Sequence, residues 1–187
     1  MRYLLLFSSL FIFLNPVFAR EIAGIQAEET ITLSNQQTLS LNGAGIRSKF
    51  FFKIYVGALY VTEPPLKTPQ AVLADTRAKR ISMHFLYDEV SKEKLNSGWH
   101  DGFMLNQDEA QLTKLKQRLE RFKGLFDAVK KGDVIYLDYL PNQGTQVTIN
   151  KEVNGTIPGF DFHQALMKVW LGEEPADWDL KKAMLGR

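Results

Sequence analysis

Short segments in which apolar and polar residues alternate predict β-strands that each bury one face. Between residues 22 and 46, apolar stretches are separated by Ser, Thr, Asn and Gln, which indicates strands and turns. Residues 42–45, Asn-Gly-Ala-Gly, are expected to be the most flexible part of this region. Residues 49–61 are almost continuously apolar and aromatic, which favours a central strand or a pair of strands.

Three more strands are expected further along the chain. Residues 80–87 alternate as Ile81, Met83, Phe85 and Tyr87. The remaining two form a predicted hairpin, residues 134–140 and 145–150, around the turn-forming residues 141–144.

Apolar residues at helical spacing predict helices between and after these strands. Leu95, Trp99 and Phe103 recur every fourth residue behind the capping hydroxyl of Ser91. A longer helix is predicted between the capping residue Asn106 and Gly132. Its lysine-rich side is interpreted as a solvated face. Shorter helices are expected at residues 69–74, 160–171 and 180–185.

The order of these elements indicates the fold class. Strands at the start and end of the chain, with helices between them and short connections, favour an antiparallel sheet covered by helices, which is an α+β fold. The chain shows no repeat and no linker. A single domain over residues 20–187 is therefore expected.

The first nineteen residues have the composition of a secretory signal peptide. Arg2 precedes an apolar run over residues 3–14, and small residues precede a cleavage site after Ala19. A membrane anchor is the alternative, but a dozen apolar residues fall short of the ~20 that span a bilayer. We therefore expect cleavage of residues 1–19, a periplasmic or secreted protein, and no transmembrane anchor thereafter.

Composition excludes several classes of function. Lys and Arg number 23 against 21 Asp and Glu, a net charge of +2 that argues against nucleic acid as a partner. The absence of cysteine removes thiol nucleophiles, iron–sulfur clusters and cysteine-ligated zinc. The three histidines match no metal-binding motif, and neither a serine-hydrolase elbow nor a dinucleotide-binding glycine pattern occurs. No catalytic residue, metal or cofactor is predicted.

One group of residues has the chemistry of a carboxylate site. Arg47 offers a planar fork of donors, Tyr55 a hydroxyl, and the intervening phenylalanines, Phe51 among them, an apolar lining. On one extended strand these two polar groups would lie roughly 26 Å apart, so joint action requires the chain to turn between them. The alternative is structural, with Arg47 at a sheet edge and Tyr55 in the core.

Two long segments resemble the bacterial chalcone isomerase-like family. They are LNGAGIRSKFFFKIYVGALYV, residues 41–61, and GFDFHQALMKVWLGEEPADWDLKKAMLG, residues 159–186. The resemblance covers nearly the whole chain after residue 19. It implies an open-faced β-sandwich, in which a helical layer covers a large antiparallel sheet and a ligand cleft lies between them.

The family contains chalcone isomerases and noncatalytic proteins that bind fatty acids in the same cleft. Arg47 matches the arginine of the isomerases, but Tyr55, Ser91 and Gly98 replace their Thr, Tyr and Asn. The fatty-acid-binding members pair an Arg with a Tyr. The resemblance therefore implies that Arg47 and Tyr55 hold a carboxylate. The expected lining of the cleft comprises Phe51, Ser91, Leu95 and Trp99.

The function expected from these observations is that of an exported, noncatalytic binding protein for a fatty acid or a similar apolar carboxylate. One alternative is an isomerase of the chalcone isomerase type, an intramolecular lyase in which Arg47 stabilises an enolate. Another is a structural or interaction module that has a filled core and no ligand.

Overall fold

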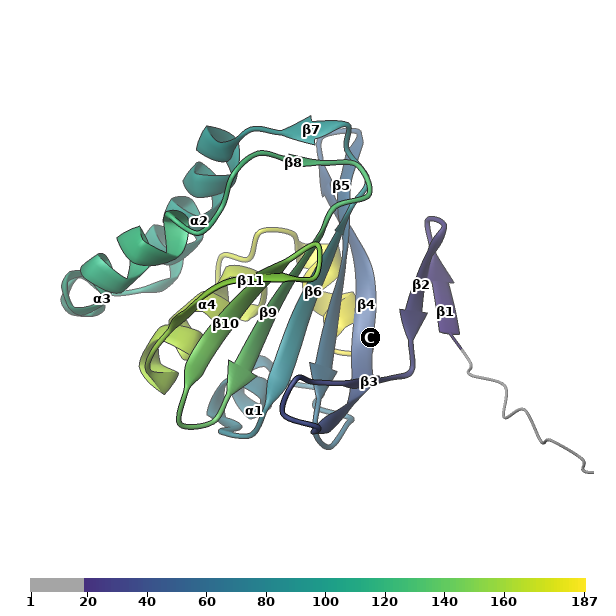
Figure 1. Ribbon diagram of the computed structural model, residues 1–187, viewed down its shortest axis with the longest axis horizontal. Helices are drawn as coiled ribbons and strands as arrows, with labels where there is room; N and C mark the ends of the chain where they lie inside the picture. Colours follow the sequence, from purple (N-terminus) through teal and green to yellow (C-terminus); the bar gives the residue numbers. More distant parts are fainter. Residues whose placement is uncertain (1–18) are drawn as a thin grey trace, which may run out of the picture.

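Seven antiparallel strands form one curled sheet in the computed structural model, which describes residues 19–187 (Figure 1). Their order across the sheet is β11-β10-β9-β6-β5-β4-β3. The strands are β3 (Thr30–Thr32), β4 (Thr38–Lys49), β5 (Phe52–Val61), β6 (Lys79–Phe85), β9 (Val134–Leu140), β10 (Gly144–Ile149) and β11 (Glu152–Ile157). Two small antiparallel pairs accompany the sheet, β1 (Ala19–Ile22) with β2 (Ile25–Glu28), and β7 (Glu89–Val90) with β8 (Val129–Lys130).

Helices cover one face of this sheet. They are α1 (Pro69–Ala74), α2 (Lys92–Asn106), α3 (Glu109–Lys123), α4 (Phe160–Leu171) and α5 (Trp178–Met184). Helix α5 packs on β4, α4 packs against β10, and α2 packs on α4, while the β1–β2 hairpin lies on the other side of the molecule (Figure 1). An antiparallel sheet with a helical layer confirms the predicted α+β class.

Within residues 19–187, no helix combines the length and the apolar composition needed to cross a membrane. The predicted signal peptide, apart from Ala19, lies outside the described residues.

Strand β5 lies inside the sheet between β6 and β4 and is buried on both faces, as its continuous apolar sequence predicts. Tyr55 and Leu59 belong to the main core between the sheet and the helices. Ala58 and Tyr60, which alternate with them, belong to a smaller cluster under β1, β2 and β3. The two faces of β5 therefore contribute to two separate hydrophobic clusters.

The glycine-rich residues 42–45 are part of β4, so the expected flexibility was wrong. Gly45 and Gly57 are partners on β4 and β5, and α5 lies directly over both. A Cβ on Gly45 would lie 2.6 Å from the Cβ of Ala183, and one on Gly57 would lie 2.9 Å from Cε of Met184. The missing side chains let a helix approach the sheet backbone closely.

The long predicted helix is shorter than expected at both ends. It begins after Asp108, whose carboxylate accepts the backbone N–H of Gln111, and it ends at Lys123 before Gly124. Phe126 and Val129 remain fully buried although they lie outside the helix. The apolar spacing of these two residues shows that they are buried in the core. It does not show that they are helical, since a loop and a short strand bury them here.

Candidate functional site

Arg47 and Tyr55 lie directly opposite each other on β4 and β5. The chain reverses between them at a tight turn, where Phe50 adopts a positive φ of 56°. The guanidinium carbon of Arg47 lies 5.6 Å from the centre of the Tyr55 ring. The turn that joint action of these residues requires is therefore present.

Tyr55 is held from the helical side. Its hydroxyl oxygen accepts a hydrogen bond of 2.9 Å from the indole nitrogen of Trp170 on α4. Burial raises the pKa of the phenol, Arg47 and the Trp170 bond lower it in part, and the carboxylate of Asp177 raises it again. The phenol is therefore neutral at physiological pH and keeps its own hydrogen for donation.

Arg47 carries an unused donor beside this phenol. Its Nε is buried and has no hydrogen-bond acceptor among residues 19–187. A buried donor without an acceptor costs free energy, typically about 1–3 kcal/mol. An acceptor oxygen at this position would remove that cost.

Asp177 connects the end of the chain to the same site. One of its oxygens accepts the backbone N–H of Ser48 at 2.9 Å, and the other accepts those of Asp179 and Leu180 at the start of α5. The carboxylate thus caps α5 and ties it to β4 next to Arg47. It also places a negative charge near the Tyr55 phenol, whose pKa it raises.

Of the predicted lining residues at and in α2, Leu95 and Trp99 point into the core, whereas Ser91 lies at the start of the helix. Leu95 and Trp99 are buried in the main core, and Trp99 packs against Trp170 with ring centres 5.8 Å apart. The indole nitrogen of Trp99 has no acceptor among the described residues. Ser91 is the N-cap of α2, where its hydroxyl oxygen accepts the backbone N–H of Lys94.

Phe51 does not line a cleft, which corrects the expectation for this residue. It sits at the turn between β4 and β5 and is 100% exposed. The apolar surroundings of Tyr55 come instead from the helices and from Phe85 on β6, whose ring centre lies 5.6 Å from that of Tyr55.

Aromatic side chains fill the layer beyond Tyr55. Trp99 contacts Phe122 and Phe126, with ring centres 5.4 Å apart in both pairs. Phe122 in turn contacts Phe162 on α4 at 5.6 Å. The tail of an apolar ligand could occupy this layer only if these rings move apart.

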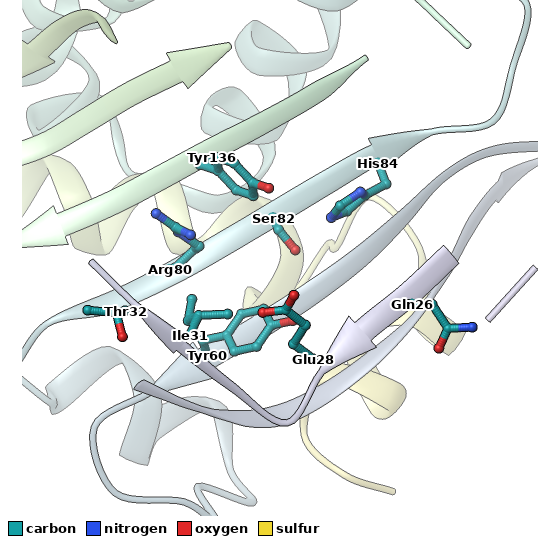
Figure 2. A pocket seen from close by; sticks show the side chains of 9 residues that line it. All are labelled: Gln26, Glu28, Ile31, Thr32, Tyr60, Arg80, Ser82, His84 and Tyr136. Carbon is teal, nitrogen blue, oxygen red and sulfur yellow. The ribbon is translucent and has the colours of Figure 1, made fainter. Parts of the chain in front are cut away.

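A separate hollow of about 210 Å³ lies on the opposite face of the sheet, facing β2 and β3 (Figure 2). Its lining is polar. Arg80 makes a two-pronged ion pair with Asp138, at 2.5 and 2.7 Å, and stacks 4.2 Å above the ring of Tyr136. Burial lowers the pKa of His84, so this imidazole is neutral at pH 7. Because Glu28 adds a negative charge, the hollow is poorly suited to a carboxylate.

Another hollow, of about 470 Å³, lies near α1 and the ends of α2 and α4. It contains two lysines whose ammonium groups already donate to the protein. Lys168 donates to the backbone carbonyl of Asn106 and to the Gln107 side chain, and Lys181 to the carbonyl of Gly172. Neither hollow includes Arg47 or Tyr55 in its lining.

Two residues of the Arg47 site, Trp170 and Asp177, lie in the segment 159–186 that resembles the family, but the sequence patterns assign neither of them to the site. The position of Asp177 before the last short helix is typical of an N-cap, which could have identified its role there. Nothing local indicates that Trp170 reaches Tyr55, because the two residues are 115 positions apart.

Comparison with known proteins agrees with this architecture. The sequence profile of a family described as chalcone isomerase-like matches residues 19–186. The crystal structure of a fatty-acid binding protein from Arabidopsis thaliana superimposes with a TM-score of 0.58 at 13% sequence identity, over 84% of this chain and 96% of the plant chain. Among curated proteins, none matches. The chain belongs to the chalcone isomerase-like family.

Proposed function

We propose that this chain is a noncatalytic binding protein for a fatty acid or a similar apolar carboxylate, and that Arg47 and Tyr55 receive its head group. The observation that carries this proposal is the position of Arg47 directly opposite Tyr55 at the edge of the apolar core. The similarity in fold to a plant fatty-acid binding protein supports it.

The donors of this pair suit a carboxylate. The Nε of Arg47 lacks an acceptor among the described residues. The Tyr55 hydroxyl accepts a hydrogen bond from Trp170, and its own O–H remains available as a donor. A carboxylate could therefore accept from both groups, and one of the two bonds would be charge-assisted. The positive charge of Arg47 favours a carboxylate over a neutral alcohol or ester, because only the carboxylate carries an opposite charge.

The tail would enter the aromatic layer between the sheet and the helices. Because Trp99 and Trp170 are part of this layer, ligand entry has to change their surroundings. Tryptophan fluorescence therefore offers a direct optical readout of binding.

Export is part of the proposal. The composition of residues 1–19 supports cleavage after Ala19 and release of residues 20–187 into the periplasm or the medium. Expression of the full sequence, followed by intact-mass measurement of the periplasmic fraction, tests this step. A protein that keeps residues 1–19 and stays in the cytosol contradicts export and leaves the ligand assignment to its own test.

The ligand is tested by extracting the purified protein with organic solvent and analysing the extract by mass spectrometry. Fatty acids in near-stoichiometric amount, absent from an Arg47→Ala variant purified in parallel, are the expected result. Chalcone turnover above the uncatalysed rate would instead favour an isomerase. A protein that carries no lipid, shows no change in fluorescence with palmitate and turns over no chalcone would be an interaction module.

A further inference from the structure

Three consecutive phenylalanines form the tip of the β4–β5 hairpin, which lies beside β7 and β8 (Figure 1). Phe50 is 85% exposed, Phe51 100% and Phe52 56%. Soluble proteins expose single apolar side chains routinely, but a contiguous exposed patch marks an interaction surface. Of the three, only Phe52 has a ring partner within residues 19–187, since it packs edge-on against Tyr87 with ring centres 5.5 Å apart. The other two rings project from the protein.

Positive charges flank this tip on both strands. Lys49 and Lys53 are exposed, and no ion pair of the described residues includes either of them. The charges of the neighbouring β7–β8 pair cancel. Glu89 lies opposite Lys130, and Asp88 lies next to Lys131. Lys49 and Lys53 therefore give the phenylalanine tip a local excess of positive charge.

We propose that the tip of the β4–β5 hairpin docks on an anionic lipid surface, with Phe50 and Phe51 in the interfacial region and Lys49 and Lys53 on the lipid phosphates. Apolar and aromatic side chains flanked by basic ones are the composition of surfaces that bind at such an interface. A projecting tip can insert between lipid molecules, whereas a groove would need a partner that projects into it. Residues 50 and 51 form the turn itself, so insertion requires no rearrangement of the sheet.

Docking in this orientation would bring the Arg47 site close to the lipid. Arg47 lies on β4 and precedes Phe50 of the turn by three residues, which limits their separation to roughly 10 Å. The docking proposal concerns only the tip and does not depend on a fatty-acid site. If both hold, the head-group site lies next to the membrane from which an apolar carboxylate would enter.

The test measures sedimentation of residues 20–187, which contain all of the described fold except Ala19, with vesicles of phosphatidylethanolamine and phosphatidylglycerol. Native protein is expected to bind, and binding should weaken with added salt. Phe51→Ser should weaken the partition roughly tenfold. Phe50→Asn together with Phe51→Ser should weaken it further, and asparagine tolerates the positive φ at residue 50. Val153→Ser removes an exposed apolar side chain from β11 and should leave binding unchanged.

Charge is tested separately. Lys49→Gln with Lys53→Gln should weaken binding to the anionic vesicles by about fivefold per lysine and abolish its dependence on phosphatidylglycerol. Lys116→Gln with Lys151→Gln removes two exposed lysines from α3 and the β10–β11 turn and is the matched control. Equal losses in the two pairs would mean that net charge, not the tip, controls binding, and would overturn the proposal.

The depth to which the tip enters the lipid is tested with Phe51→Trp. On vesicle binding, the fluorescence of this tryptophan should shift to the blue and be quenched by brominated acyl chains. Native protein that fails to sediment with anionic vesicles at low salt would overturn the proposal, as would tip variants that bind as tightly as native protein. Concentration-dependent self-association that Phe51→Ser abolishes, without vesicle binding, would assign the tip to a second copy of the chain instead. Palmitate titration in vesicle-free solution, unchanged in Phe51→Ser, separates this result from that of the proposed ligand site.

Discussion

Tyr55 and Trp170 are joined by a hydrogen bond of 2.9 Å between the phenolic oxygen and the indole nitrogen, which ties β5 to α4 inside the protein. Both side chains are almost completely buried, at 3% and 1% exposed. The phenol thus has two roles, because it accepts the Trp170 N–H and keeps its own hydrogen, which the proposed function assigns to the ligand carboxylate.

Tyr55→Phe should lower the free energy of unfolding by about 1–3 kcal/mol, because it leaves the Trp170 N–H buried without an acceptor. In a Trp170→Phe background the same change should cost less, since no such donor remains. Urea unfolding of the four proteins of this cycle measures the difference. An equal cost in both backgrounds would mean that the hydrogen bond contributes nothing to stability.

Arg47→Ala should weaken palmitate binding by roughly ten- to a hundredfold, the equivalent of a charge-assisted bond worth about 1.5–3 kcal/mol. Arg47→Lys should recover only part of this loss, because an ammonium lacks the planar fork. Tyr55→Phe should weaken binding less, by about 0.5–1.5 kcal/mol. Fluorescence titration and thermal unfolding of each variant provide the measurement. A folded Arg47→Ala protein with unchanged affinity would remove Arg47 from the site.

Asp177→Asn should strengthen binding of palmitate severalfold. The amide oxygen can still cap α5, the bond from the Ser48 N–H is lost, and the negative charge near Tyr55 is removed. Hexadecanol, which has the same tail and no charge, should bind to both proteins equally. A parallel change for the acid and the alcohol would indicate an altered pocket shape and contradict the electrostatic explanation.

Gly43→Ala should destabilise the protein by about 1–3 kcal/mol or more, because its Cβ would collide with the backbone carbonyl oxygens of Ala183 and Met184. Backbone atoms cannot rotate away, so α5 would have to leave the sheet. Gly98→Ala is the control. Nothing lies within 4 Å of a Cβ there, and alanine should stabilise α2 by about 0.5–1 kcal/mol. Thermal unfolding should therefore show opposite shifts, and equal shifts would refute the close-packing explanation.

The stability of the protein should increase from about pH 8 to 9.5 because of Lys79. This side chain is 1% exposed, and its ammonium donates to the backbone carbonyls of Asp75 and Arg77. Burial lowers its pKa to about 8. The unfolded chain keeps this proton up to about pH 10.4, so it binds more protons than the folded chain in this window. Raising the pH therefore favours the folded state.

Urea unfolding at several pH values, compared between native protein and Lys79→Met, checks this sign. The native protein should gain up to about 1.4 kcal/mol per pH unit relative to the variant. The series ends below the range in which tyrosines ionise, where the opposite dependence begins. Parallel pH profiles for the two proteins would show that Lys79 stays charged in the fold.

Local patterns in the sequence predicted most of the strands and helices correctly, because alternation and helical spacing report which residues must be buried. The same patterns do not show which backbone conformation brings these residues into the core. Phe126 and Val129 fit the spacing of the preceding helix, yet they reach the core from a loop and from β8. Periodicity specifies the burial of a side chain and leaves open the backbone conformation that achieves it.

The sequence by itself determined the family, the α+β class and the two polar residues of the candidate site. Only the tertiary structure decided how these residues meet. The turn after Lys49 reverses the chain and exposes Phe51. A register shift between Arg47 and Ser48 then places Arg47 opposite Tyr55, where the turn alone would place it opposite Ile54. Trp170 joins the site from a distant helix. Such contacts depend on how whole elements pack together, and no spacing along the chain encodes them.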